Sequence, residues 1–351
     1  MRRIRLYISL FVLALIVLSA AGYAAFWYAA GATVRDVIAR WAVERRAAGW
    51  QVQLDEPVIS GFPFRIQVSI GAASIAGPGE PPAWAWTAPR LGATAKPWRP
   101  EHLDISAPGL HLLTVGEDTF RVNAAEAAGE LDADDKAVRA GRFTFQGISV
   151  SRGEEPPVSA EAFDIRVGPL AERDRSAGNA SGAQAAGAKP AAGIGLSAHA
   201  AAITVPELWS APLGRTVESV GLEAVITGDM APGGKVSDML TRWRTSGGVV
   251  EVKKFSIVWR ALRLAATGTF ALDASLQPQG ATTAEIDGFD QAADVLTAAG
   301  MIDARTAFAA KVMNKVLTLG GGPARLPLTI QQQQVYLGPV PMARLTAMKW
   351  D

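Results

Sequence analysis

The stretch GGVVEVKKFSIVWRALRLAATGTFALDASLQPQG, residues 247–280, carries the strongest structural pattern in the sequence. Apolar side chains alternate in it with polar or small ones, which is the period of a β-strand with one buried face. Gly268 is expected at a bend, and residues 278–280 form a turn signal. The pattern predicts three strands in series that cover a common apolar surface.

Large apolar side chains gather on one face of these predicted strands. We predict that they form one continuous surface, a groove that binds lipid, acyl chains or another hydrophobic ligand. A strand face looks the same in sequence whether it contacts a lipid or a helix, so an ordinary protein core is the alternative. The predicted groove residues are Phe255, Ile257, Trp259, Leu262, Leu264, Phe270 and Leu272.

An uncharged run from Leu6 to Ala30 follows directly on MRRIR at the N-terminus. A helix of this run, at about 1.5 Å per residue, is long enough to cross a hydrocarbon core of roughly 30 Å. The three arginines before it predict a cytoplasmic start, a single pass through the inner membrane and a periplasmic location for the bulk of the chain. A cleaved signal peptide is the alternative, because small residues in 19–24 offer cleavage sites.

The charge balance and the lack of cysteine limit the partners and modifications that the chain can have. The 34 Lys and Arg nearly balance the 33 Asp and Glu, which argues against a nucleic-acid partner. The chain has no cysteine, so neither a disulfide nor a lipid-modified cysteine is possible.

The predicted fold class is mainly β with some α. An N-terminal transmembrane helix precedes an extended, twisted antiparallel sheet, an open groove or half-barrel, capped by short helices. Helical spacing predicts helices at 235–244, 288–302 and 304–319, and the segment 326–338 is expected to form a hairpin. The predicted organisation is a cytoplasmic start and anchor at 1–31, a stalk helix at 32–50, a β-rich first half at 51–175, a disordered Gly/Ala-rich loop at 176–195, and a β-rich second half with amphipathic helices at 196–351.

No motif in the sequence indicates catalysis. His102, His111 and His199 lie in unrelated segments without the spacing of metal ligands. The acidic clusters at 132–135 and 287–290 lack the alternating ligands of a calcium loop and are expected in solvated turns. We therefore predict no catalytic residue, no metal and no cofactor; a hydrolase with an unrecognised site is the third hypothesis, after a lipid-binding domain and a structural or partner-binding envelope protein.

Several segments resemble the uncharacterised bacterial family known as domain of unknown function 2125, which is typical of alphaproteobacteria. They are the N-terminal anchor, the GFP tripeptide from residue 61, the APRL and KPW segments in 88–98, the run 247–289, and the closing PLTIQ and VYLGP. Gln332 and Gln333 depart from the acidic-Gly turn expected there. The resemblance implies an anchored envelope protein of a double-membraned bacterium, and it brings no catalytic residues. A more distant architectural likeness, an anchor followed by apolar-faced strands, links the chain to lipid-handling proteins of the AsmA type.

Overall fold

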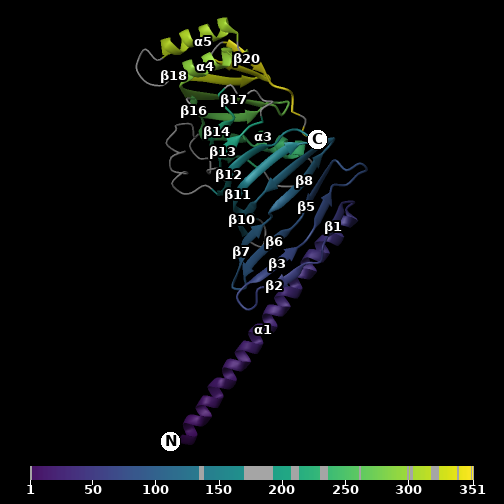
Figure 1. Cartoon of the computed structure of the whole chain (residues 1–351). Coiled ribbons are helices and arrows are strands. Elements are labelled where there is room, and N and C mark those ends of the chain that lie inside the picture. The colour runs from purple at the N-terminus through teal and green to yellow at the C-terminus, as the bar shows by residue number, and fades with distance from the viewer. Residues whose placement is uncertain are drawn as a thin grey trace. The chain divides into compact units, whose positions relative to one another are not determined.

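The computed structural model describes residues 2–133, 138–169, 193–206, 213–229, 236–260, 262–298, 300, 303–317, 324–337, 340–348 and 350. Its strands pair in an open antiparallel sheet that does not close into a barrel, which confirms the predicted fold class (Figure 1). Contacts divide the chain into two compact units. Unit 1 comprises Met1–Val138 and Val150–Glu155, and unit 2 comprises Arg139–Ser149 and Pro156–Asp351.

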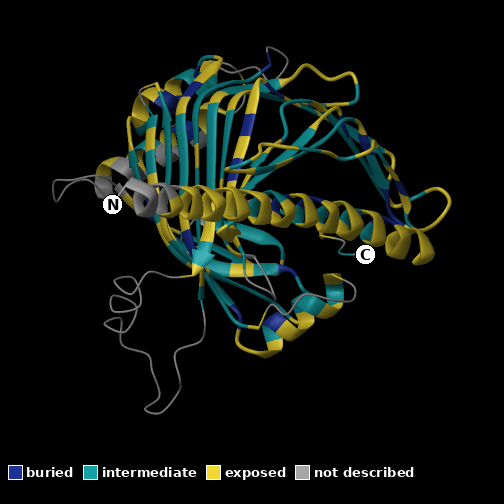
Figure 2. Cartoon of the chain, turned by 90° about the horizontal axis from the view of Figure 1, so that it is seen from below, coloured by how far each residue is buried: buried dark blue, intermediate teal, exposed yellow. Residues whose placement is uncertain are grey.

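Unit 1 begins with one long helix, α1 (Arg2–Ala47). The helix runs without a break through the predicted anchor and the predicted stalk. It ends at Ala47, and Gly49, just beyond the last turn, has a φ of +85° in the left-handed region. The amides of Gly49 and Trp50 donate back to the carbonyl oxygens of Arg46 and Arg45, which satisfies the last turn. Figure 2 shows the helix exposed along most of its length.

The remaining strands of unit 1 form a kinked antiparallel meander. They are β1 (Gln51–Leu54), β2 (Val58–Ser60), β3 (Ile66–Ile70), β4 (Ala73–Ala76), β5 (Trp84–Ala88), β6 (Leu91–Lys96), β7 (Arg99–Ser106), β8 (Gly109–Val115), β9 (Asp118–Ala124) and β10 (Glu126–Ala133). On one side of the kinks the pairing runs β1, β4, β5, β8, β9, and on the other side β2, β3, β6, β7, β10. Four of the five interruptions contain a residue that weakens a strand, namely Pro57, Gly71, Pro89 or Pro108.

Unit 2 is a longer meander with helices inserted at two places. Its elements, with β11 shared between the units, are β11 (Val138–Arg152), β12 (Val158–Pro169), β13 (Gly193–Thr204), β14 (Thr216–Thr227), α3 (Val236–Thr245), β15 (Val249–Trp259), β16 (Leu262–Leu272), β17 (Pro278–Asp287), α4 (Phe289–Ala298), α5 (Ala304–Leu317), β18 (Ala324–Gln331), β19 (Gln334–Leu337) and β20 (Val340–Arg344). From β12 to β20 each strand pairs with the next one along the chain. All three predicted helices of this half are present.

The 247–280 stretch holds two complete strands, β15 and β16, instead of the predicted three, and residues 278–280, which were expected to form a turn, begin β17. Gly268 lies inside β16, where it pairs with Val252 and Thr282. A Cβ added to it would stand 2.5 Å from the carbonyl oxygen of Ala281, so the glycine allows a close approach of β17. The bend comes later, at Leu276, which has a φ of +57°.

Turns precede β3 and join the two strands of the C-terminal hairpin. Phe64 lies in the turn before β3, which begins at Ile66. The predicted C-terminal hairpin is confirmed as β18 and β19. Its turn residues Gln332 and Gln333 both have positive φ, at +51° and +60°, the conformation that two-residue hairpin turns require.

Most of the predicted disordered loop at 176–195 lies outside the described residues. The structure resumes at Gly193, where β13 begins, so the last three residues of the segment belong to a strand. The division of the chain into two halves at this segment stays a prediction. The boundary between the two compact units lies earlier, within β11.

The described core consists mainly of small residues. Most of its buried apolar positions are alanines, including Ala73, Ala124, Ala284 and Ala293, and no large side chain is fully buried in the described part of the chain. Large apolar side chains are therefore left half-buried on the faces of the sheet.

Candidate functional site

The strand register places the seven predicted groove residues on one face of unit 2. Phe255 pairs with Ala266, Ile257 with Leu264, and Trp259 with Leu262, and directly paired residues of antiparallel strands share a face. Phe270 and Leu272 follow on the same face by alternation along β16. All seven are half-buried.

The same face continues in both directions across the meander. A bulge in β15 between Val252 and Phe255 keeps the register in phase. We call the whole surface the apolar face of unit 2. Following the pairings outward, its other members are Phe163, Ile165 and Val167 on β12, Ile194, Leu196, Ala198 and Ala200 on β13, Val220, Leu222, Ala224 and Ile226 on β14, Val250 and Val252 on β15, Ala284 and Ile286 on β17, and Leu326, Leu328 and Ile330 on β18.

Helices cover one end of this face. α4 contacts β16 and α5 contacts β18. Ala284 and Leu326 on the apolar face are buried, whereas their neighbours Thr283 and Pro327 on the other face are exposed. The helices therefore lie on the apolar face at this end, as the sequence predicted for two amphipathic helices.

The other end of the face is more open. Val167 and Ile194 keep 38% and 39% of their surface exposed, although both belong to the apolar face. Figure 2 shows the long strands mainly in the intermediate burial class. Trp259 is held by a hydrogen bond of 2.9 Å from its indole nitrogen to the carbonyl oxygen of Gly214. The open end of the face is therefore a wide apolar surface with partial exposure.

The opposite face of unit 2 is polar. Asp164, His199, Gly221 and Ser256 follow one another across four strands on this side. Together with Arg142 and other charged residues they line a depression of about 390 Å³. Cations and carboxylates are mixed there, so the depression favours no single class of ligand.

Unit 1 contains a second apolar surface, a cavity of about 650 Å³ between α1 and the sheet. We call it the helix–sheet cavity. Its helical wall is formed by Phe26, Ala30, Val34 and Ile38, which recur at helical spacing on one side of α1. Gly31 brings the helix into close contact with β2, where a Cβ added to the glycine would stand 3.1 Å from a methyl group of Ile59.

The sheet wall of the cavity comes from β3, β6 and β7. Val68 pairs with Ala93, and Ala95 pairs with both Ile66 and Leu103, so these side chains share one face. All of them line the cavity. No pattern in the sequence indicates this cavity, because the cavity depends on where α1 crosses the sheet.

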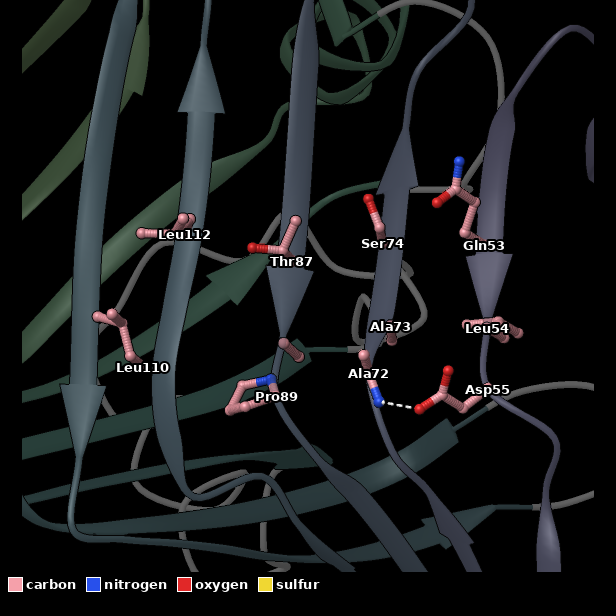
Figure 3. Close-up of a pocket in the computed structure, with 11 residues that line it drawn as sticks. Gln53, Leu54, Asp55, Ala72, Ala73, Ser74, Thr87, Pro89, Leu110 and Leu112 are labelled. Carbon is pink, nitrogen blue, oxygen red and sulfur yellow. Dashed lines mark hydrogen bonds between the residues drawn. The ribbon is translucent and has the colours of Figure 1, made fainter.

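A smaller depression of about 400 Å³ lies along the kinks of unit 1 (Figure 3). Its charged residue, Asp55, accepts a hydrogen bond of 2.7 Å from the amide of Ala72 and also bonds Ala72 through its own amide. The carboxylate therefore bridges two strands where their ladder is interrupted. This is a structural role and not an arrangement for acid–base chemistry.

The three histidines are in separate places, in line with the sequence analysis. His102 and Asp132 form a hydrogen bond of 2.8 Å, and this bond, together with the charges of Asp132 and Asp104, raises the pKa of the imidazole above its ordinary value. The ring of His111 stacks on Trp86. Among the described residues no group of three or more His, Cys, Asp or Glu is placed to hold a metal ion. The expectation that the acidic clusters lie in turns is wrong for their described members, because Asp132 belongs to β10, Asp287 to β17 and Asp290 to α4. Residues 134–137 lie outside the described residues.

Comparison with known proteins identifies a family but no function. No curated protein and no solved structure matches the chain, so the likeness to AsmA-type proteins is not confirmed. A family model described as "Uncharacterized protein conserved in bacteria (DUF2125)" matches residues 27–346, which include the later part of α1 and nearly all of both units. The chain therefore belongs to the DUF2125 family of bacterial proteins.

Proposed function

We propose that this protein is anchored in the inner membrane by α1, faces the periplasm, and binds lipid acyl chains along the apolar face of unit 2 without catalysing a reaction. The observation that carries the proposal is the continuity of that face. Apolar side chains occupy most of it from β12 to β18, with Thr282 a polar exception on β17, and the seven predicted groove residues on it are all half-buried. A wide apolar face that stays only partly buried is a candidate binding surface.

The anchor is supported by the length and composition of α1. Among the described residues it is the helix long and apolar enough to cross a membrane. The contacts of Tyr23 favour an uncleaved helix over the signal-peptide alternative. Its hydroxyl donates to the carbonyl oxygen of Pro63 and its ring contacts Phe62. Cleavage after Ala24 would remove these contacts from unit 1.

The test compares polar substitutions on the two faces of the same strands. Ile257→Asn and Leu264→Asn place an amide on the apolar face, whereas Ala265→Asn, the matched control, places it on the opposite face next to Ser256. Full-length protein is purified in mild detergent, its unfolding temperature is measured, and co-purifying lipids are quantified by mass spectrometry. We expect the first two variants to lose bound lipid with little change in stability, and the control to retain it.

The structural alternative gives the opposite result. An unpaired polar group buried in a closed core costs roughly 1 to 3 kcal/mol. A large fall in the unfolding temperature of Ile257→Asn and Leu264→Asn, with no lipid on the unmutated protein, would reject lipid binding. The apolar face would then be an internal core or a protein-binding surface.

A further inference from the structure

One end of the unit 1 sheet is fixed to α1 near the end of the apolar run. The indole nitrogen of Trp27 donates to the carbonyl oxygen of Arg65 at 2.8 Å, and Tyr23 bonds Pro63 in the same β2–β3 turn. Tyr23 lies about 26 Å along the helix from Leu6. That distance is close to the roughly 30 Å thickness of a hydrocarbon core. Where α1 crosses a membrane, this end of the sheet therefore meets the far interface.

Exposed aromatic residues occur at the same end of the sheet. Phe62 and Phe64 in the β2–β3 turn are 49% and 67% exposed, and Trp98 in the β6–β7 turn is 58% exposed. Because Ile66 pairs with Ala95, both turns leave the sheet at one end. Tryptophan is enriched at membrane–water interfaces, and exposed phenylalanine adds apolar area that the interface can bury.

The helix–sheet cavity begins at this level and extends away from it. Phe26, which belongs to the apolar run, lines one end of the cavity, and Ile38 lies about 18 Å further along the helix. The volume of about 650 Å³ falls within the range of ligand-binding pockets. Apolar side chains form most of the walls. Lys96, an exposed cation, lines the cavity at the end where the β6–β7 turn begins.

We propose that the helix–sheet cavity takes up one acyl chain of a phospholipid from the outer leaflet of the membrane that α1 crosses, with the lipid phosphate near Lys96. The proposal rests on the anchoring in the proposed function but concerns a different surface from the apolar face of unit 2. The acyl chain replaces water against the apolar walls. The cation at the open end matches the negative charge of the headgroup.

The test uses full-length protein in vesicles of phosphatidylethanolamine and phosphatidylglycerol. A trace of phosphatidylethanolamine carries a photoreactive diazirine at the end of one acyl chain, and peptide mass spectrometry maps the adducts after irradiation. We expect adducts in the membrane-crossing part of α1 and also on Ile70 and Leu91, which line the cavity. Bulk bilayer lipid does not reach residues this far along the sheet.

A matched pair of variants tests whether the cavity itself holds the chain. Val68→Trp fills the cavity, whereas Gln67→Trp puts the same indole on the opposite face of β3. We expect Val68→Trp to reduce the adducts on Ile70 and Leu91 by roughly tenfold, because the volume for a chain is lost. Gln67→Trp should leave them unchanged.

Each contrary result has a distinct meaning. Adducts in α1 without adducts on Ile70 and Leu91 of the unmutated protein would overturn the cavity proposal and leave the anchor standing. No adducts in α1 would overturn the anchor itself. Equal labelling of the cavity by a diazirine fatty acid in the absence of vesicles would also overturn the proposal, because the chain would not come from the membrane. The map of the unmutated protein decides the question even if Val68→Trp fails to fold.

Discussion

Single residues explain where simple alternation failed to predict the strands. Gly268 was expected at a bend because glycine interrupts an apolar pattern, yet it lies in β16 where β17 approaches closely. Sequence alone does not separate these two uses of glycine, since both depend on the missing side chain. Three prolines of unit 1 mark interruptions of its strands. Pro57, Pro89 and Pro108 all lie at kinks of unit 1, because proline cannot donate a hydrogen bond to the ladder.

One electrostatic contact between described side chains joins His102 to Asp132. The pKa of His102 is raised first by the hydrogen bond with Asp132 and further by the charges of Asp132 and Asp104, and Arg99 acts against them. A pKa that is raised on folding means that the contact stabilises the protein at low pH. The contribution is lost as the pH rises through the pKa of the folded state.

We predict that Asp132→Asn lowers the pKa of His102 and that Asp104→Asn lowers it less. The reason is that Asp132 accepts the hydrogen bond, whereas Asp104 acts only through its charge. The measurement is an NMR titration of the His102 ring. An unchanged pKa in Asp132→Asn, or a larger shift in Asp104→Asn, would show that the contact does not persist in solution.

At the scale of elements, helices and strands were predictable, but the contacts between α1 and the sheet were not. The amphipathic spacing of α4 and α5 and the alternation of β15 and β16 are local patterns that a short window of sequence contains. The helix–sheet cavity depends on the β2–β3 turn, which lies about 40 residues from its partner on α1, since Tyr23 bonds Pro63. A local pattern cannot show a contact across that separation.

The β2–β3 turn should control how firmly α1 holds the sheet. Phe62 stacks on Tyr28 and meets Trp27 edge-on, with ring centres 6.1 Å and 5.6 Å apart. Each aromatic pair contributes about 0.5 to 1.5 kcal/mol beyond the burial of its area. We therefore predict that Phe62→Ala loosens the turn, seen as faster hydrogen–deuterium exchange in residues 61–70.

The matched control for this prediction is Phe64→Ala, in the same turn. Phe64 is more exposed than Phe62, so its removal should leave exchange at β3 nearly unchanged. Equally faster exchange in both variants would contradict the role of Phe62 in holding the turn on α1, since it would mean that any change in the turn loosens it.

At the scale of the whole molecule, the sequence predicted the class of fold but not the extent of the apolar face. Each strand has its own alternation, and only the register shows that the faces from β12 to β18 coincide. The bulge in β15 is essential here, because without it half of the strand would turn its apolar residues to the other side. The sequence of one strand does not determine which residue of the neighbouring strand lies opposite such a bulge.

The orientation of the chain in the membrane can be tested directly, because the protein has no cysteine of its own. We predict that a cysteine introduced at Gly153 or Ser246 reacts with a membrane-impermeant maleimide in spheroplasts, whereas a cysteine at Arg3 reacts only after the membrane is permeabilised. The arginines at the start of the chain favour retention in the cytoplasm. Labelling of the Arg3 position in intact spheroplasts would contradict this prediction. It would show that the chain has the opposite orientation or does not span the membrane.

Lipid contact at the apolar face of unit 2 can be tested directly. A photoreactive amino acid is placed in the face itself. Benzoylphenylalanine replaces Leu264 in one variant and Ala265, its neighbour on the opposite face, in another. Both variants are irradiated in cells, and the mass of the intact purified protein is measured. We predict a phospholipid adduct at position 264 and none at position 265. No adduct at 264, or equal adducts at both positions, would contradict this prediction.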